Sequence, residues 1–202
     1  MQVNNESTSP AVTESQPARP RRWQAMRIAI AAVVVLGVTV AAAAAFVSSG
    51  MYDVAATTPH YDVTYKVLRT LVVQSIKRHA VDVKVPADLG NPEKIHSGFK
   101  NFNAMCVGCH VAPGAPPSEI SKGLYPLPPN LADAVKGWKP EELYVIIKNG
   151  IKMSGMPAWE QSHSGDEIWA LVALLNVLPN MAPEEYREAA EYVEQQEGGS
   201  GH

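Results

Sequence analysis

The sequence predicts a mainly α-helical protein in which a single transmembrane helix precedes a small helical domain. A stretch of twenty residues without a charge, 28–47, supplies the transmembrane helix. Downstream, apolar residues recur at helical spacing, as in the run IWALVALLNVL, and proline-rich stretches separate these runs. The only two cysteines stand in the run Cys-Val-Gly-Cys-His, which is the most specific feature of the helical domain.

Composition divides the 202-residue chain into five expected segments. They are a disordered cytoplasmic tail (1–27), a transmembrane anchor (28–47), a juxtamembrane amphipathic helix with its linker (48–90), the small domain with the cysteine run (91–180), and an acidic helix with a flexible tail (181–202). The net charge is only −3, so nothing in the composition favours nucleic-acid binding.

The uncharged stretch is long enough to cross a bilayer, because twenty helical residues span roughly 30 Å. Four arginines precede it and no Lys or Arg follows until Lys66, so the positive-inside rule leaves the N-terminus in the cytoplasm and exports the rest. A cleaved signal peptide is the alternative, since 41–45 offers Ala-x-Ala cleavage sites. The lengths of the apolar stretch and of the segment before it favour an uncleaved anchor.

The first exported helix is expected over 60–79, with Thr58 as its cap and Pro59 at its first position. Its apolar side chains form one stripe, and its basic residues occupy other faces. Such a helix either packs against the following domain or lies on an anionic membrane surface, and the need of the stripe for a partner favours packing. The stretch 81–86 alternates like a short strand or an extended linker.

Two helices are expected around the cysteine run and after it. Pro92 opens the first, which runs into Cys106. The second spans 140–149 and ends at Gly150 in a left-handed turn. Between them, the proline-rich runs APGAPP and YPLPPN predict irregular loop rather than helix.

The last two expected helices differ in character. The first of them spans 164–178, begins with a capping box of Ser164 and Glu167, and is almost wholly apolar. The second, 183–197, is strongly acidic. It is either a docking surface or a solvated flank, and its charge favours a solvated flank.

Cys106, Cys109 and His110 form the Cys-x-x-Cys-His pattern of covalent haem attachment. Two thiols three residues apart on a helical turn reach the two vinyl groups along one edge of a porphyrin, and the adjacent imidazole ligates the iron. A disulfide, a thioredoxin-like pair and a zinc site are the other uses of such cysteines. No strand-helix-strand pattern surrounds the run and no second cysteine pair completes a zinc site, so covalent haem is favoured.

The second axial ligand of the iron is expected to be Met156, in the run Lys-Met-Ser-Gly-Met-Pro-Ala-Trp. A thioether is a soft ligand that favours ferrous iron. Gly155 lets the backbone bend, and Pro157 stiffens its exit. Met153 is the nearest rival, whereas Met105 belongs to the proximal segment. Ligation by a second histidine stays open, the candidates being His60, His79, His96 and His163.

Residues 91–180 resemble a mono-haem class I cytochrome c, a small helical domain around one covalent haem. The resemblance rests on ordered motifs: Gly-x-x-x-Phe-x-x-x-Cys ending at Cys106, the haem run, Pro-Asn-Leu at 129–131, Gly-Met-Pro-Ala-Trp at 155–159 and Leu-Val-Ala-Leu-Leu at 171–175. It implies that Gly98 lets the last helix of the domain cross closely. It also implies that the Pro129 carbonyl accepts a hydrogen bond from the ring of His110. The haem-binding residues implied beyond the cysteines are Pro129, Leu131 and Trp159.

The resemblance implies one-electron transfer rather than enzymatic catalysis, with one covalently attached haem c. With the anchor, the chain is similar to membrane-tethered bacterial cytochromes, which implies the bacterial cytoplasmic membrane and a haem domain in the periplasm. The implied partners are a redox donor and a redox acceptor protein.

Two alternatives to a tethered carrier stay open. One is a haem subunit of a larger respiratory oxidase or dehydrogenase complex. The other, less favoured, is a haem-based gas sensor or peroxidase, since the sequence supplies no dedicated distal His/Arg pair beside Met156. Four lysines are candidates for steering a partner toward the haem edge or are ordinary solvated side chains: Lys122, Lys136, Lys148 and Lys152.

Overall fold

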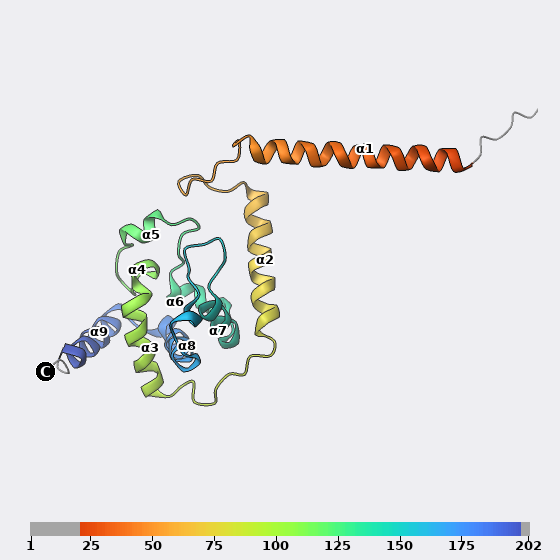
Figure 1. Ribbon diagram of the computed structural model, residues 1–202. Helices are drawn as coiled ribbons and strands as arrows, with labels where there is room; N and C mark the ends of the chain where they lie inside the picture. The colour runs from red at the N-terminus through yellow and green to blue at the C-terminus, as the bar shows by residue number, and fades with distance from the viewer. Residues whose placement is uncertain (1–20, 199–202) are drawn as a thin grey trace, which may run out of the picture. The chain divides into compact units, whose positions relative to one another are not determined.

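The computed structural model describes residues 21–198, in which helices are the only regular secondary structure (Figure 1). The expected mainly helical fold is confirmed. The chain divides into two compact units, one ending at Asp53 and one beginning at Val54. Most of the tail expected before the anchor (1–20) and the end of the expected C-terminal tail (199–202) lie outside the described residues.

The first unit contains one long helix, α1 (Arg21–Ser48), which includes the uncharged stretch. All of its side chains are exposed. By length and composition α1 could cross a membrane.

The core of the second unit is the crossing of α3 (Pro92–Met105) with α8 (Gly165–Val177). The two backbones meet at Gly98, where an added Cβ atom would lie 2.0 Å from the carbonyl oxygen of Ala170. Only a residue without a side chain permits this approach. Eight consecutive residues of α8, 168–175, are buried, because helices pack against more than one of its sides.

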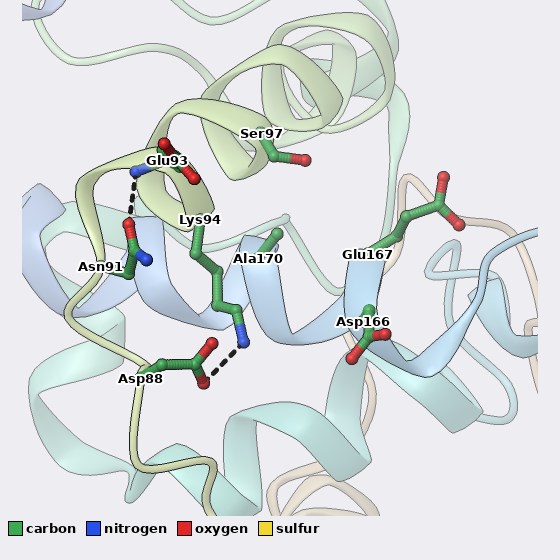
Figure 2. A pocket seen from close by; sticks show the side chains of 8 residues that line it. All are labelled: Asp88, Asn91, Glu93, Lys94, Ser97, Asp166, Glu167 and Ala170. Carbon is green, nitrogen blue, oxygen red and sulfur yellow. Dashed lines mark hydrogen bonds and ion pairs between the residues drawn. The ribbon is translucent and has the colours of Figure 1, made fainter.

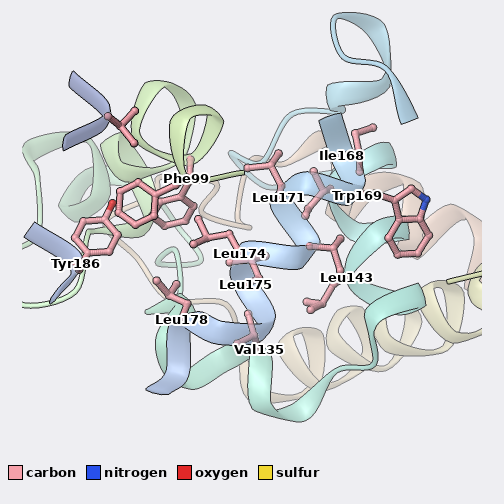
Figure 3. Close-up of a cluster of buried hydrophobic side chains, with 14 residues drawn as sticks. Phe99, Val135, Leu143, Ile168, Trp169, Leu171, Leu174, Leu175, Leu178 and Tyr186 are labelled. Carbon is pink, nitrogen blue, oxygen red and sulfur yellow. The ribbon is translucent and has the colours of Figure 1, made fainter. Parts of the chain in front are cut away.

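Helices α7 (Pro140–Asn149) and α9 (Pro183–Gly198) complete this core. In Figure 3 the leucines of α8 lie between Phe99 and Tyr186 on one side and Leu143 and Trp169 on the other. The Trp169 ring stacks on Tyr144 of α7 with centroids 4.3 Å apart. Across the unit, α9 contacts α3, α3 contacts α8, α8 contacts α7, and α7 contacts α2 (Figure 1).

The acidic α9 has one buried face, so the expectation of a wholly solvated flank is wrong. Tyr186 and Val193 are 4% and 6% exposed and belong to the same core as α3 and α8. Their spacing of seven residues places them on one side of a helix. The glutamates on the other sides that the structure describes, such as Glu184 and Glu188, stay exposed.

Helix α2 (Asp62–Ala80) packs on α7 through its C-terminal half, which confirms the packing interpretation for that half. Ile76 and Ala80 form a second buried cluster with Val145 of α7. The expected cap is wrong: Thr58 lies in a turn, with its N–H donating to the carbonyl of Ala55 at 3.1 Å. The residues 81–86 form no strand and connect α2 to α3 as an irregular linker.

The remaining elements are short. Residues 111–130 are mostly irregular, as expected. They contain one short helix that the surrounding prolines did not predict. Ser118 caps this helix, because its hydroxyl accepts a hydrogen bond from the Ser121 N–H at 2.9 Å. The short helices are α4 (Val107–His110), α5 (Glu119–Gly123), α6 (Leu131–Ala134), and the 3-10 turns η1 (Val135–Gly137), η2 (Trp159–Gln161) and η3 (Leu178–Asn180).

Side chains at the helix starts explain why α3, α7 and α8 begin where expected. The Glu93 N–H donates to the Asn91 side chain at 2.8 Å at the start of α3. The Ser164 and Glu167 capping box is confirmed, with the Ser164 N–H donating to the Glu167 carboxylate at 2.8 Å. At α7 the Glu142 carboxylate accepts from the Lys139 N–H at 2.9 Å, which supplies half of a capping box without a capping residue.

Candidate haem site

The cysteine run lies at the end of α3, on the first turn of a new helix. Cys106 joins α3 to α4, and its carbonyl accepts from the His110 N–H at 2.8 Å and from the Cys109 N–H at 3.1 Å. This turn holds both thiols and the imidazole within one helical repeat. The two cysteines form no disulfide with each other. Before haem is attached, burial, followed by the nearby Cys109, raises the pKa of the Cys106 thiol to about 12.

The ring of His110 is fixed by the Pro129 carbonyl, 3.0 Å from its Nδ1. Because a carbonyl oxygen only accepts, Nδ1 carries the hydrogen and Nε2 keeps the lone pair that could bind a metal. Burial lowers the pKa of His110, and the hydrogen bond to Pro129 opposes this only in part. The imidazole is therefore neutral at neutral pH, which is the form that ligates iron.

The Pro-Asn-Leu corner that holds the His110 ring is itself fixed locally. The Asn130 side chain accepts from the Ala132 N–H at 3.0 Å and so caps α6. Leu131, the first residue of α6, packs against the core. A carbonyl anchored on a capped helix start is a rigid hydrogen-bond partner.

Met156 closes a compact loop after α7. The Ile151 N–H donates to the Met156 carbonyl at 3.2 Å, and the Ser154 N–H donates to the Ile151 carbonyl at 3.2 Å. The Ser154 hydroxyl donates to the Ile151 carbonyl at 2.7 Å and accepts from the Met156 N–H at 3.2 Å. These four hydrogen bonds fix the backbone that carries the thioether.

Two glycines permit this loop, for different reasons. Gly150 has φ +62°, and an added Cβ there would lie 2.5 Å from Pro157, so it brings the two ends of the loop together. The backbone bends at Gly155 as expected, and the positive φ within residues 151–156 lies at Met153, at +64°. The missing side chain of Gly155 leaves space for Leu124, because an added Cβ atom would lie 2.7 Å from the Leu124 side chain.

The structure distinguishes the candidate methionines. Met156 is half-buried and packs against the core, whereas Met153 is 77% exposed. Met105 also packs on the core, but at the end of α3 next to Cys106. Trp159, in the turn after Met156, packs against the same core.

The four alternative histidines are engaged in other contacts. The ring of His60 lies edge-on to Tyr125 at 5.1 Å, and the ring of His96 lies edge-on to Tyr192 at 6.1 Å. His79 Nδ1 lies 2.7 Å from the carbonyl of Ser75. His163 contacts the Ser162 hydroxyl at 2.9 Å and the ring of Trp159 at 5.3 Å.

Helix α9, which the sequence did not place in the domain, packs against α3, the helix that leads into the cysteine run. Tyr186 of α9 donates a hydrogen bond to Asn103 and lies 4.8 Å from the ring of Phe99. Burial, followed by the neighbouring Cys106, raises the pKa of Tyr186. The apolar spacing of Tyr186 and Val193 within the acidic segment is the signal that could have revealed this helix as part of the domain.

A separate hollow of about 310 Å³ lies where the start of α3 meets the start of α8 (Figure 2). Its lining is polar and mixed in charge, and Lys94 pairs there with Asp88 at 2.9 Å. It contains no thiol, imidazole or thioether, so it does not suit a haem. Within residues 21–198, no three His, Cys, Asp or Glu side chains are placed to hold a metal ion together.

The donor groups around the cysteine run fit a covalently attached haem. Two protein thiols, a neutral imidazole with a free Nε2 and a half-buried thioether are the groups that a c-type haem uses. Cys106, Leu131, Met156 and Trp159 all pack on one apolar core, which would exclude water from a bound ring.

Comparison with known proteins gives one family. Residues 93–175 match the family described as cytochrome C oxidase, cbb3-type, subunit III. This segment begins in α3, ends in α8 and includes the cysteine run, the Pro-Asn-Leu corner and the methionine loop. No curated protein matches the chain.

Proposed function

Residues 93–175 form a cytochrome c domain with covalently bound haem c, and on this premise we propose that the chain is a membrane-tethered one-electron carrier whose iron is ligated by His110 and Met156. Electron transfer by haem is the activity that such a domain implies. The observation that carries the ligand assignment is the His110–Pro129 hydrogen bond, which leaves Nε2 available. The closed loop that carries a half-buried Met156 supplies the second ligand.

Each residue has one task in this proposal. The thiols of Cys106 and Cys109 add to the vinyl groups of haem and become thioethers. Bound haem supplies an iron that takes up one electron as Fe(III) and releases it as Fe(II). Pro129 keeps the His110 ring in one orientation, and the Met156 thioether stabilises the reduced iron and so raises the reduction potential.

The remaining residues limit the chemistry to electron transfer. Leu131 and Trp159, packed on the core, keep water away from the ring. If His110 and Met156 both ligated the bound iron, no coordination position would be left for a substrate or gas. A gas sensor or peroxidase would need the methionine to leave the iron, whereas the four hydrogen bonds of its loop fix the backbone position from which the Met156 side chain extends.

We also propose an orientation. Helix α1 stays as an uncleaved anchor in a bacterial cytoplasmic membrane, the N-terminus lies in the cytoplasm, and the haem domain lies in the periplasm. Four arginines precede the uncharged stretch, and no Lys or Arg follows until Lys66, which supports this direction.

A second candidate function is a haem subunit of a larger respiratory complex. The observation that favours it is the matched family, which is described as a subunit of a cbb3-type oxidase. Purification in mild detergent distinguishes the two candidates. A monodisperse single chain supports the carrier, and co-purification with further subunits in fixed proportion supports the complex.

Two of the four lysines that could steer a redox partner form ion pairs within the protein. Lys136 pairs with Asp133 at 3.0 Å, and Lys148 pairs with Glu160 at 3.1 Å, so part of their charge is used within the protein. Lys122 and Lys152 are exposed and remain the candidates for meeting an acidic redox partner.

Carbon monoxide binding tests the proposed iron ligation. We expect the reduced full-length protein in detergent to keep its haem spectrum when carbon monoxide is added at neutral pH, because Met156 holds the sixth position. Met156→Ala should bind carbon monoxide at once, and Met153→Ala should behave like the unchanged protein. Rapid binding to the unchanged protein, or to Met153→Ala but not to Met156→Ala, would refute the assignment.

A further inference from the structure

We propose that the outward face of α2, formed by Val63, Val67 and Leu71, lies on an anionic lipid surface and holds the cytochrome c domain beside the membrane. This docking rests on the proposed membrane tethering and goes beyond it. A tether alone leaves the domain free to tumble, whereas a docked helix gives the haem a fixed orientation toward partners in the same membrane.

Helix α2 has two apolar faces, of which the protein covers only one. Val72, Ile76 and Ala80 pack toward α7. Val63, Val67 and Leu71 are 69%, 53% and 61% exposed. Their spacing of four residues places these three side chains on one side of the helix, one turn apart. A continuous exposed stripe of this kind marks an interaction surface rather than scattered surface residues.

The charges around the stripe specify the kind of surface. Lys66, Lys77 and Arg78 are exposed. At 100° per residue, Lys66 and Lys77 border the stripe, and Arg78 continues it seven residues after Leu71. Asp62, in the first turn, is the only acidic residue of α2. Apolar side chains flanked by Lys and Arg are the composition of helices that lie in the plane of an anionic bilayer surface, with long basic side chains reaching the headgroups.

The chain itself keeps this face near a membrane. Residues 49–61 connect the end of α1 to the start of α2, and a fully extended chain of that length spans at most about 45 Å. The exposed apolar positions occupy the half of α2 that follows this connection, and the buried ones occupy the other half. A short connection makes membrane contact effectively intramolecular, so a weak surface affinity is sufficient for docking.

The test measures backbone hydrogen exchange of α2 in the full-length haem-loaded protein. The protein is placed in nanodiscs of phosphatidylcholine alone or of phosphatidylcholine with phosphatidylglycerol. We expect the amides of 62–71 to exchange several-fold more slowly in the anionic discs, while those of α3 and α8 exchange equally in both. The haem absorption spectrum is recorded on the same samples, so a failure of iron ligation is detected separately from a failure of docking.

Two variants and one control sharpen the test. Val63→Ser/Val67→Ser/Leu71→Ser should lose the added protection. Lys66→Gln/Lys77→Gln/Arg78→Gln, which leaves the apolar stripe intact, should lose the difference between the two discs. A matched triple control at exposed apolar positions outside α2, Val85→Ser/Ile120→Ser/Leu127→Ser, should keep it. Equal exchange in both discs for the unchanged protein would overturn the proposal, as would protection that arises only in native membranes containing a partner protein.

Discussion

At His110, one hydrogen bond decides which ring nitrogen is available. The Pro129 carbonyl, 3.0 Å away, occupies the Nδ1 hydrogen, and burial keeps the ring neutral. Both effects come from the fold rather than from the Cys-x-x-Cys-His run, because Pro129 lies on a corner that Asn130 fixes at the start of α6. The sequence motif supplies the imidazole ligand, whereas contacts with a distant segment of the fold set the orientation of its ring.

Leu124 is the residue through which the loop after the cysteine run supports the methionine loop, since it fills the space that Gly155 leaves. Leu124→Ala should loosen this support and let carbon monoxide displace Met156 in the reduced protein faster, with an unchanged ferric spectrum. Leu127→Ala, at a 65% exposed position in the same loop, is the control. Equal displacement rates in both variants would show that Leu124 does not position the loop.

Gly98→Ala tests the close crossing of α3 and α8. Gly98→Ala places a Cβ atom against the Ala170 carbonyl, so α3 and α8 must separate. Overpacking of this kind costs about 1–3 kcal/mol, and we expect the upper end because the obstacle is backbone. Denaturant unfolding measures the loss. Gly123→Ala, where nothing lies within 4 Å, should change stability little; equal losses in the two variants would contradict the close crossing.

Among the helices, those with strong local signals were predicted well. Asn91 and Pro92 start α3, and Ser164 with Glu167 starts α8, so propensity and packing agree there. The start of α2 was missed because Thr58 is a good cap locally, whereas the structure places it in a turn. The turn α5 was missed because prolines surround it, although Ser118 and Glu119 carry a helix-start signal.

The part of the candidate site that lies within one short sequence motif could be predicted from the sequence. Cys106, Cys109 and His110 are predicted by their spacing and Met156 by the loop around it, whereas the role of Pro129 comes only from the resemblance. Contacts between distant segments, such as Tyr186 with Asn103 or Leu124 with Gly155, leave no mark in a single sequence. They depend on which helices meet, and a short-range pattern does not contain that information.

Helix α9 is held to the domain by a buried phenol. Tyr186→Phe removes the donor and leaves Asn103 without its partner, which should lower the free energy of unfolding by about 1–2 kcal/mol. Thermal unfolding of the haem-loaded protein measures it. Tyr65→Phe, at a half-exposed position, should be neutral. An unchanged stability of Tyr186→Phe would mean that the hydrogen bond contributes nothing.

The start of α8 gives a pH-dependent prediction. Hydrogen bonds from the Ser164 backbone and hydroxyl lower the pKa of Glu167, so the charged carboxylate is the form that stabilises the helix. A carboxyl whose folded pKa is lowered stabilises the protein above its unfolded pKa, and the stabilisation is lost as pH falls through the folded pKa. Glu167→Ala should therefore lower the melting temperature at neutral pH, and the difference should vanish in acid. A difference independent of pH would refute the capping role.

The chain as a whole joins a cytochrome c domain to one helix that could cross a membrane. The family match ends at residue 175, but the buried core continues to Val193, so α9 belongs to the same folded unit. In the proposed arrangement the membrane restricts where the haem meets its partners, while His110, Met156 and the core set its potential. These two functions use separate parts of the chain and can be altered independently.

The central claim is a one-electron carrier with His110 and Met156 on the iron. An equilibrium redox titration of the haem absorption, on the full-length protein and on Met156→Ala, tests it most directly. The account predicts a single one-electron transition in the unchanged protein and a transition at lower potential in the variant, because the thioether favours ferrous iron. The same midpoint potential in both proteins would contradict it.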